Sequence, residues 1–499
     1  MAMKDIHKSY IPLEREEGFL QRQVPRLKTL VLILIVGVVL ATQIYNPNKR
    51  VIEAMAGLLL ISIMWRFSIL PALWMFLIMY PFPFAISWGT SNEIFVLVII
   101  LVATLRVSTR EHTFSIDRKI RLPLLLMVFS YLFSFLNVTP ELTHYSLVNT
   151  FNFLTAAMFM LLIINFVTDE KKLRKTLQIM MISVALFIAF TIFEMLFPGR
   201  TIIPNWLYTT HRTRLIMKDI RMGGPFHDYE LAAEFFTLNA FFIFFLFLRS
   251  KRMLFRALFG ALLLVDLFMM FTTITRGALF SLLAGTAYLV FLSRKELNAV
   301  RLTYIVGGLV LTLFVMEWFV ATYTTSGSLF SRVVETTFER GLIPTNRVGT
   351  WEGAFERGME NPIFGHGAGW DVGGKLWFGL WPHSLYLFYF NITGLFGLGA
   401  FILLVSKLLR STMSGLKTSL VSSPFPEAFM KIMHVVLIIF LFDQIKIEYL
   451  RNSMYTYFIW FMFGLIIATH NIIIKQRNGR KTSDLAAAAA GQATVDTAP

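Results

Sequence analysis

Long apolar runs follow one another along almost the whole chain and are separated by short polar connections. Each run is close to the ~20 residues with which an α-helix crosses the ~30 Å hydrocarbon core of a bilayer. The pattern therefore predicts an all-α polytopic membrane protein with about fourteen transmembrane helices. We expect these helices over residues 28–45, 51–66, 67–88, 93–107, 122–138, 146–167, 175–197, 229–249, 255–273, 277–293, 302–321, 384–406, 430–443 and 453–474. The runs 51–66 and 430–443 are short for a span.

The composition agrees with a membrane protein. Apolar residues make up 56% of the chain and charged residues 15%, whereas a soluble globular protein is about 25% charged. The absence of cysteine excludes disulfides and thiolate metal sites. The first apolar run follows about 27 polar residues and lacks the small-residue cleavage site of a signal peptide, so we expect it to remain as a helix.

The net charge of +16 comes from basic residues in the connections, with no soluble basic domain that would bind nucleic acid. The connection 106–121 is rich in Arg and Lys, whereas 88–92 and 139–145 contain neither. Because cytoplasmic loops are enriched in Lys and Arg, both termini are expected in the cytoplasm. The segments 198–228 and 322–383 are then expected on the outer face.

These expectations divide the chain into seven parts. The two outer segments are about thirty and sixty residues long. Connections of this length between membrane helices are usually functional or disordered, and the Trp, Gly, Pro and apolar residues of these two favour folded caps. The final part contains a run of five alanines, Ala486 to Ala490, and is predicted to be disordered. The parts are a cytoplasmic segment 1–27, helices 28–197, an outer loop 198–228, helices 229–321, a large outer loop 322–383, helices 384–474 and a tail 475–499.

Arginines on the expected outer side are the main candidates for chemistry. Arg221 precedes the helix near Tyr229, Arg276 lies in a tight turn between two helices, and Arg347 lies in the large loop. An arginine at membrane depth costs roughly 2.5–3.5 kcal/mol on insertion scales, so it is usually paired or functional, and its planar fork suits phosphate. For Arg212, Arg214 and Arg332, contact with lipid head groups or water is the simpler interpretation.

His383 is the second candidate. It follows Pro382 at the outer mouth of an expected helix, and Pro suits a first helical turn because its missing N–H does no harm there. A histidine at this boundary is able to take a proton from a hydroxyl near neutral pH. A lone interfacial histidine is more often a polar anchor, so position alone does not decide between the two roles.

Four stretches, in order, resemble the O-antigen polymerase and O-antigen ligase superfamily of bacterial membrane glycosyltransferases. They are Arg221-Met-Gly-Gly-Pro-Phe-His-Asp-Tyr-Glu-Leu-Ala-Ala, Thr275-Arg276-Gly277-Ala278, Arg347-Val-Gly-Thr-Trp351 with Glu360-Asn-Pro-Ile-Phe-Gly-His-Gly-Ala-Gly369, and His383-Ser384 with Gly394-x-x-Gly397. The resemblance covers roughly residues 220–400. Asp228-Tyr229 stands where the family often has Pro-Asn, and His366 where it usually has an apolar residue.

The resemblance implies a GT-C-like architecture in a bacterial inner membrane and an active site on the outer face. Its donor is an undecaprenyl-pyrophosphate-linked glycan, its acceptor a lipid-linked repeat unit or lipid A core, and a chain-length regulator is an expected partner. No metal, nucleotide or other cofactor is expected, so fixed cations must meet the charge that grows on the leaving pyrophosphate. We expect Arg221, Arg276 and Arg347 to bind it, and His383 to orient or deprotonate the acceptor with inversion at the anomeric carbon. Substrate-positioning roles are expected for Ser384, Gly365, Gly367 and Trp351.

A polymerase is the favoured activity, because two carrier-linked glycans would need the large cap, and a ligase is the close alternative. A transporter of lipid-linked glycan or solute is the alternative from another class, although no internal repeat is visible and the charges gather near helix ends. Asp266, in the middle of an apolar run, is as compatible with a structural role as with a functional one. Glu194 and Glu335 are alternative bases supported only by their expected side of the membrane.

Overall fold

The computed structural model describes residues 69–83, 85–86, 89–108, 114–197, 221–296, 299–323, 328–334, 345–369 and 382–495. The expected helices 28–45 and 51–66 lie outside these ranges, as do the segment 1–27, Glu335 and most of the loop 198–228 with Arg212 and Arg214. The side chain of Arg332 is also outside the described part.

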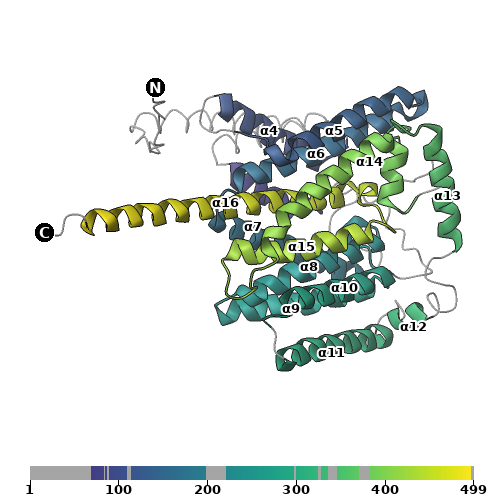
Figure 1. The fold of residues 1–499 in the computed structure, drawn as a ribbon. Helices are drawn as coiled ribbons and strands as arrows, with labels where there is room; N and C mark the ends of the chain where they lie inside the picture. Colours follow the sequence, from purple (N-terminus) through teal and green to yellow (C-terminus); the bar gives the residue numbers. More distant parts are fainter. Residues whose placement is uncertain are drawn as a thin grey trace, which may run out of the picture. The chain divides into compact units, whose positions relative to one another are not determined.

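The described chain is almost entirely helical, which confirms the all-α expectation (Figure 1). A two-residue antiparallel pair, β1 (Ala85–Ile86) with β2 (Gly89–Thr90), is the exception among the described residues. The longer helices are α3 (Ile69–Met79), α4 (Ser91–Ser108), α5 (Arg118–Ser134), α6 (Thr143–Phe166), α7 (Glu170–Leu196), α8 (Tyr229–Arg249), α9 (Met253–Thr272), α10 (Arg276–Ser293), α11 (Ala299–Tyr323), α13 (Thr345–Glu360), α14 (Leu385–Thr412), α15 (Phe425–Asp443) and α16 (Ser453–Val495).

Within the described ranges, nine helices are long and apolar enough to cross a membrane. They agree in position with nine of the expected spans, including the short run 430–443, which forms all of α15 after its first five residues. The expected span 67–88 is shorter in the structure, because α3 ends at Met79 and the chain then turns into the β1–β2 pair.

The local sequence explains where several helices begin: the Asp117, Asp169 and Asp228 carboxylates cap α5, α7 and α8 by accepting backbone N–H groups.

The core is formed by α8, α15 and α16, which are surrounded by the other spans. The most apolar window of these three helices is 83%, 78% and 83% buried, against 33% for α9 and 39% for α5. Along the sides, α8 packs on α9, α5 on α14 and α6 on α16 (Figure 1). Aromatic rings fill the centre, including Phe235 against Phe458 and Phe440 against Phe463. The outer faces of α5 and α9 retain exposed apolar side chains, as expected for helices that contact lipid.

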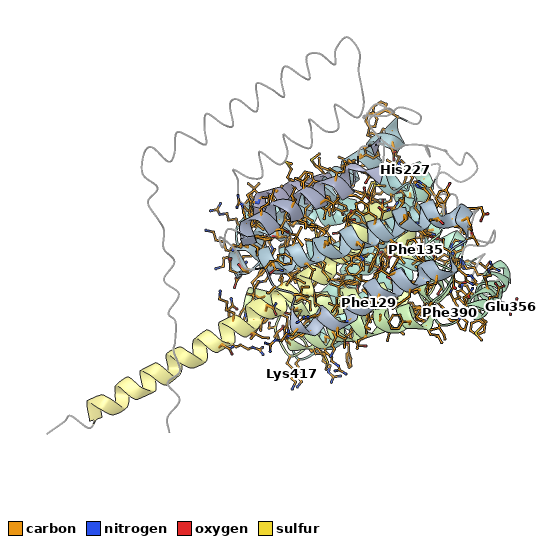
Figure 2. All side chains as sticks on the ribbon, turned by 90° about the horizontal axis from the view of Figure 1, so that it is seen from above. Phe129, Phe135, His227, Glu356, Phe390 and Lys417 are labelled. Atoms are coloured by element: carbon orange, nitrogen blue, oxygen red, sulfur yellow. The ribbon has the colours of Figure 1, made fainter. Side chains whose placement is uncertain are left out.

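The two ends of the packed helices differ in charge. We call the end at which α8 begins and α15 ends the site end. At the opposite end, Arg174 stacks on Phe425, Arg477 pairs with Glu427, and Arg249 donates to backbone carbonyls near Val421. Figure 2 labels Lys417 at that opposite end and Glu356 of α13 at the site end.

The described parts of the large loop and of the C-terminal tail both contain helices. The loop 322–383 contains two helices, α12 (Leu329–Val333) and α13, so part of it is a folded cap as expected. In contrast with the disorder expected over 475–499, α16 continues through the alanine run to Val495. Alanine has the highest intrinsic helix propensity, so the run extends the preceding helix.

Candidate functional site

The site is built around the start of α8. Residues Gly224–Phe226 form a short 3-10 turn, in which Phe226 packs on Phe187 with 4.7 Å between ring centroids. His227 then adopts a left-handed conformation with φ of 52°, and the Asp228 carboxylate accepts the backbone N–H groups of Glu230 and Leu231 at 2.9 and 3.1 Å. This cap fixes Asp228 and Glu230 at the site end.

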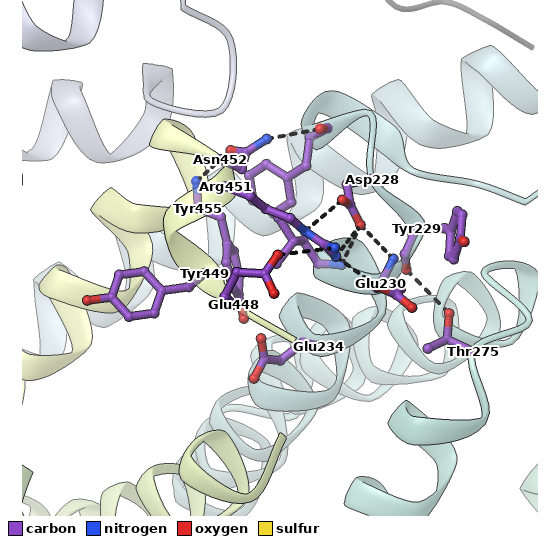
Figure 3. A network of polar contacts seen from close by, with 12 residues as sticks. Asp228, Tyr229, Glu230, Glu234, Thr275, Glu448, Tyr449, Arg451, Asn452 and Tyr455 are labelled. Carbon is purple, nitrogen blue, oxygen red and sulfur yellow. Dashed lines mark hydrogen bonds and ion pairs between the residues drawn. The ribbon is translucent and has the colours of Figure 1, made fainter. Parts of the chain in front are cut away.

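Arg451 lies at the centre of an ion-pair network with three carboxylates (Figure 3). Its guanidinium is 2.9 Å from Asp228, 3.0 Å from Glu230 and 3.5 Å from Glu448. The Arg451 side chain is only 12% exposed and Glu448 is fully buried. Burial alone would lower the pKa of Arg451, but the carboxylates of Asp228, Glu448 and Glu230 raise it above its ordinary value. The guanidinium therefore stays charged and joins the start of α8 to the chain just before α16.

Glu230 also joins this network to Arg347. One Glu230 oxygen is 3.0 Å from Arg451, and the other is 2.9 Å from Arg347. A second nitrogen of Arg347 donates to the Lys446 carbonyl at 3.2 Å. Arg347 is twice as exposed as Arg451, at 24% of its side chain, so it is the more accessible of the two to a bound anion.

The Thr275-Arg276-Gly277 turn lies against the same region. Ile274, before it, has φ of 48°, a strained conformation for a β-branched residue. Its carbonyl accepts a hydrogen bond from Arg221 at 2.7 Å, and the Arg221 guanidinium lies 4.0 Å from the centre of the Tyr229 ring. The Thr275 hydroxyl reaches the Tyr229 carbonyl at 3.4 Å. The turn and the start of α8 are therefore held together, with half-buried Arg276 at the first position of α10.

Lys446 brings a further cation to this turn. A Cβ atom added to Gly277 would lie 2.0 Å from the Lys446 Nζ, so the absence of a side chain at Gly277 makes room for the lysine. The same Nζ is 2.6 Å from the carboxylate of Asp443, which also accepts from the Ser281 hydroxyl at 2.6 Å. Lys446 is thus held between α10 and the end of α15.

His383 lies in the electrostatic field of the same network. Burial lowers the pKa of its imidazole to about 4, with Arg451 and Arg347 acting in the same direction and Glu230 opposing them. The ring is therefore neutral near pH 7 and able to accept a proton. The residue has φ of 46° and is followed by buried Ser384.

The start of α14 is fixed by the end of α15. The Leu385 N–H donates to the Gln444 carbonyl at 2.9 Å, and the Gln444 side chain donates to buried Glu234 at 2.9 and 3.1 Å. The remaining oxygen of the Gln444 amide accepts the Tyr449 N–H at 3.1 Å. Gln444 therefore positions His383 indirectly, through the backbone of the next helix.

The structure does not bring Gly365 and Gly367 to this ion-pair network. These glycines lie beside a break in α14 at Gly394, which has φ of 66° and ψ of −167°. At the break, two N–H groups and two carbonyls of α14 pair with the loop 362–367 instead of with each other. The hydrogen bonds run from Leu395 N to Pro362 O at 2.8 Å, Phe396 N to Ile363 O at 3.2 Å, His366 N to Asn391 O at 2.8 Å and Gly367 N to Ile392 O at 3.0 Å.

This exchange explains the glycine spacing in the third and fourth motifs. The Gly365 N–H donates to Asn361 O at 2.9 Å, so the backbone donors of the glycine turn are used inside the protein rather than for a phosphate. Trp351, from the same motif, lies on α13 one turn after Arg347. Gly365 and Gly367 therefore have a structural role at the α14 break. The segments of Arg221, Arg276, Arg347 and His383, in contrast, meet around the start of α8.

Substituting Gly394 by alanine is expected to destabilise the protein by at least about 2 kcal/mol. An added Cβ would lie 2.2 Å from the Ile363 carbonyl oxygen, at a φ that L-residues rarely adopt. Unfolding of the purified protein in detergent would measure the loss. Gly399→Ala is the matched control, because no atom lies within 4 Å of its added Cβ on the same helix. Equal stability of both variants would contradict the role assigned to the break.

Sequence reasoning missed Arg451, Glu230 and Lys446. For Arg451 and Lys446 the available signal was the charge in the short connection 444–452 between two apolar helices, the same feature that singled out Arg276. Glu230, within the first motif, carried no such signal of its own. Asp228, noted only as a departure from the family pattern, is the cap of α8 and a partner of Arg451. Within the described ranges, no three His, Asp or Glu side chains are grouped as metal ligands would be.

Comparison with known proteins adds no assignment to this geometry. No protein-family model matches the chain, and no curated protein matches it significantly.

Proposed function

We propose that this protein is a membrane glycosyltransferase that polymerises polysaccharide repeat units, with a polyprenyl-pyrophosphate-linked glycan as donor. The observation that carries the proposal is the meeting of the Arg221, Arg276 and Arg347 segments with His383 around Glu230. These segments are distant in the sequence and each was singled out by its own motif. We assign the site end to the outer face of a bacterial inner membrane, because basic residues gather at the opposite end.

In this mechanism the arginines stabilise the leaving group. As the bond between the anomeric carbon and the pyrophosphate breaks, its electron pair goes to the phosphate oxygen, and negative charge grows there. We assign this role to Arg347, Arg276 and Arg221, of which Arg347 has 24% of its side chain exposed. Fixed cations meet this charge without reorganisation of solvent. Arg451, which is saturated by carboxylates, holds the framework and does not contact substrate.

His383 acts on the acceptor. Its neutral imidazole accepts the proton of the attacking sugar hydroxyl as the new glycosidic bond forms, and the attack inverts the anomeric carbon. In the weaker form of this role, His383 only orients the acceptor hydroxyl, and the hydroxyl loses its proton late in the reaction.

The direct test is transfer in vitro, with purified protein, a synthetic polyprenyl-pyrophosphate repeat unit, and neither metal nor nucleotide. A ladder of longer lipid-linked glycans is the expected result. Product that forms only after lipid A core is added would assign the protein as a ligase. Movement of the donor across liposomes without any product would favour a transporter and contradict the proposal.

The pH dependence of transfer tests the role of His383. Because its pKa is about 4, the rate should change by less than about twofold between pH 7.5 and 5.5 and fall only as the pH approaches 4. A histidine with the ordinary pKa near 6.5 would lose about nine-tenths of its neutral form by pH 5.5.

His383→Ala should lower the rate at least ~100-fold, and His144→Ala, at an exposed histidine near the same end, should not. A loss of only a few-fold in His383→Ala would leave a positioning role.

A further inference from the structure

The cap helix α13 has two different apolar surfaces. Its inner surface packs on α14: the Asn391 amide donates to the Ala354 carbonyl at 2.9 Å, and Gly358 lies directly against the Phe390 ring. Both Ala354 and Gly358 are buried. This contact fixes the orientation of α13, which crosses the end of α14 instead of running along it (Figure 1).

A second apolar surface of α13 faces outward. Val348, Phe355 and Met359 are spaced to lie on one side of a helix, and they are 40%, 53% and 53% exposed. The adjoining side carries exposed Glu356 and Glu360, whereas exposed Glu352, three residues before Phe355 and seven before Met359, lies at the edge of the stripe. Around the helix axis, the order is therefore α14, a narrow exposed apolar stripe, and then an acidic surface. We call Val348, Phe355 and Met359 the α13 stripe.

The α13 stripe is continuous with apolar surface on the membrane-spanning helices. Phe355 contacts the Phe390 ring of α14, with 5.9 Å between centroids. Beyond α13, exposed Ile363 lies next to exposed Leu395 because of the hydrogen bonds at the α14 break. On α5, Phe133 is 43% exposed, with its ring 5.3 Å from Phe364 of the same loop. Since α5 and α14 are apolar enough to span a membrane, their exposed side chains contact acyl chains.

We infer that α13 is an interfacial helix whose stripe lies among the acyl chains of the leaflet at the site end. The continuity with the surfaces of α5 and α14 favours lipid over a protein partner. Glu356 and Glu360 then face the water above the head groups. Attachment is hydrophobic, because exposed carboxylates outnumber the exposed Arg357 on the polar side of α13. The same helix carries Arg347, which bonds to Glu230 and to the Lys446 carbonyl. Lipid contact by the stripe therefore holds Arg347 at head-group depth, whatever group it binds there.

Single-cysteine labelling tests this inference directly, because the natural chain has no cysteine. The variants Phe355→Cys and Met359→Cys report on the stripe, and Glu356→Cys and Glu360→Cys on the acidic side one helical turn or less away. All four residues are exposed, so a spin label at each is compatible with the fold. The full-length protein is reconstituted in vesicles of phosphatidylethanolamine and phosphatidylglycerol. Collision of the label is then measured with oxygen, which concentrates in lipid, and with a water-soluble nickel chelate.

Labels at Phe355 and Met359 are expected to collide severalfold more with oxygen than with the chelate, and labels at Glu356 and Glu360 to show the reverse. The contrast should persist at high salt, since the contact is hydrophobic. Chelate access at all four positions would overturn the inference, because α13 would then stand in water. Protection of the stripe from both reagents would also overturn it, because a second copy of the protein would then cover the stripe.

Discussion

Arg347→Ala is expected to lower glycan transfer at least ~100-fold while the protein remains folded in the membrane, since removal of one preorganised donor to a developing oxyanion has an effect of this size. Arg347 is the more exposed of the two arginines in the network, with one nitrogen on Glu230 and another on the Lys446 carbonyl. Its position is thus set before substrate binds. The rate is measured with the synthetic lipid-linked donor, and folding by thermal unfolding in detergent.

Arg357→Ala is the matched control for this variant. Arg357 lies on the same helix and pairs with Glu360, three residues along it, on the exposed side. Its removal should leave transfer unchanged. Near-normal transfer by Arg347→Ala would contradict the assigned pyrophosphate site. Loss of transfer by both variants would mean that transfer depends on the stability or position of α13 rather than on the Arg347 guanidinium.

Arg451→Ala is expected to destabilise the protein by about 3–5 kcal/mol, the usual effect of removing one partner from a buried ion pair. Without the guanidinium, Asp228 and fully buried Glu448 would lose their compensating charge, and Glu230 would keep only Arg347 as a partner among these ion pairs. The protein should therefore accumulate poorly and unfold at a lower temperature. Arg451→Lys keeps the charge but not the planar fork that contacts three carboxylates, and should be intermediate.

Arg477→Ala provides the comparison for an exposed pair. Arg477 is 52% exposed and bonds to Glu427 at the opposite end of the helices. Its loss should change stability by no more than about 1 kcal/mol. A similarly small effect in Arg451→Ala would contradict the central role assigned to Arg451.

Hydropathy predicted most of the described helices, because the bilayer sets their length independently of tertiary contacts. Even α15, whose apolar run 430–443 is short, is a helix, since Phe425 to Phe429 extend the run with a Pro in its first turn. The same reasoning overextended α3, because Tyr80 to Pro83 are apolar enough for a span and yet form a turn. Hydropathy does not encode where a helix ends in a turn of apolar residues.

The candidate site was predictable where a single residue carried an unusual local signal. Arg276 in a tight turn and His383 before a helix were such residues, and the structure brings them to one end. The charge in the connection 444–452 marked Arg451 in the same way, but its pairing with Glu230 was not predictable, because it depends on the meeting of α8 with the chain before α16. Gly365 and Gly367 resembled a phosphate-binding turn, and only the position of the α14 break shows where their backbone donors go.

The break in α14 also bears on how the protein is assembled during translation. Residues 362–367 precede α14 in the chain, so they leave the ribosome before the helix whose carbonyls and N–H groups they pair with. In hydrocarbon, each unpaired backbone group costs several kcal/mol, and a broken helix that inserted alone would have to wait for a later segment to pair with it. Here the partner has already been made when Gly394 emerges. The order of segments along the chain is therefore also a workable order of insertion, with the cap loop first and the broken helix after it.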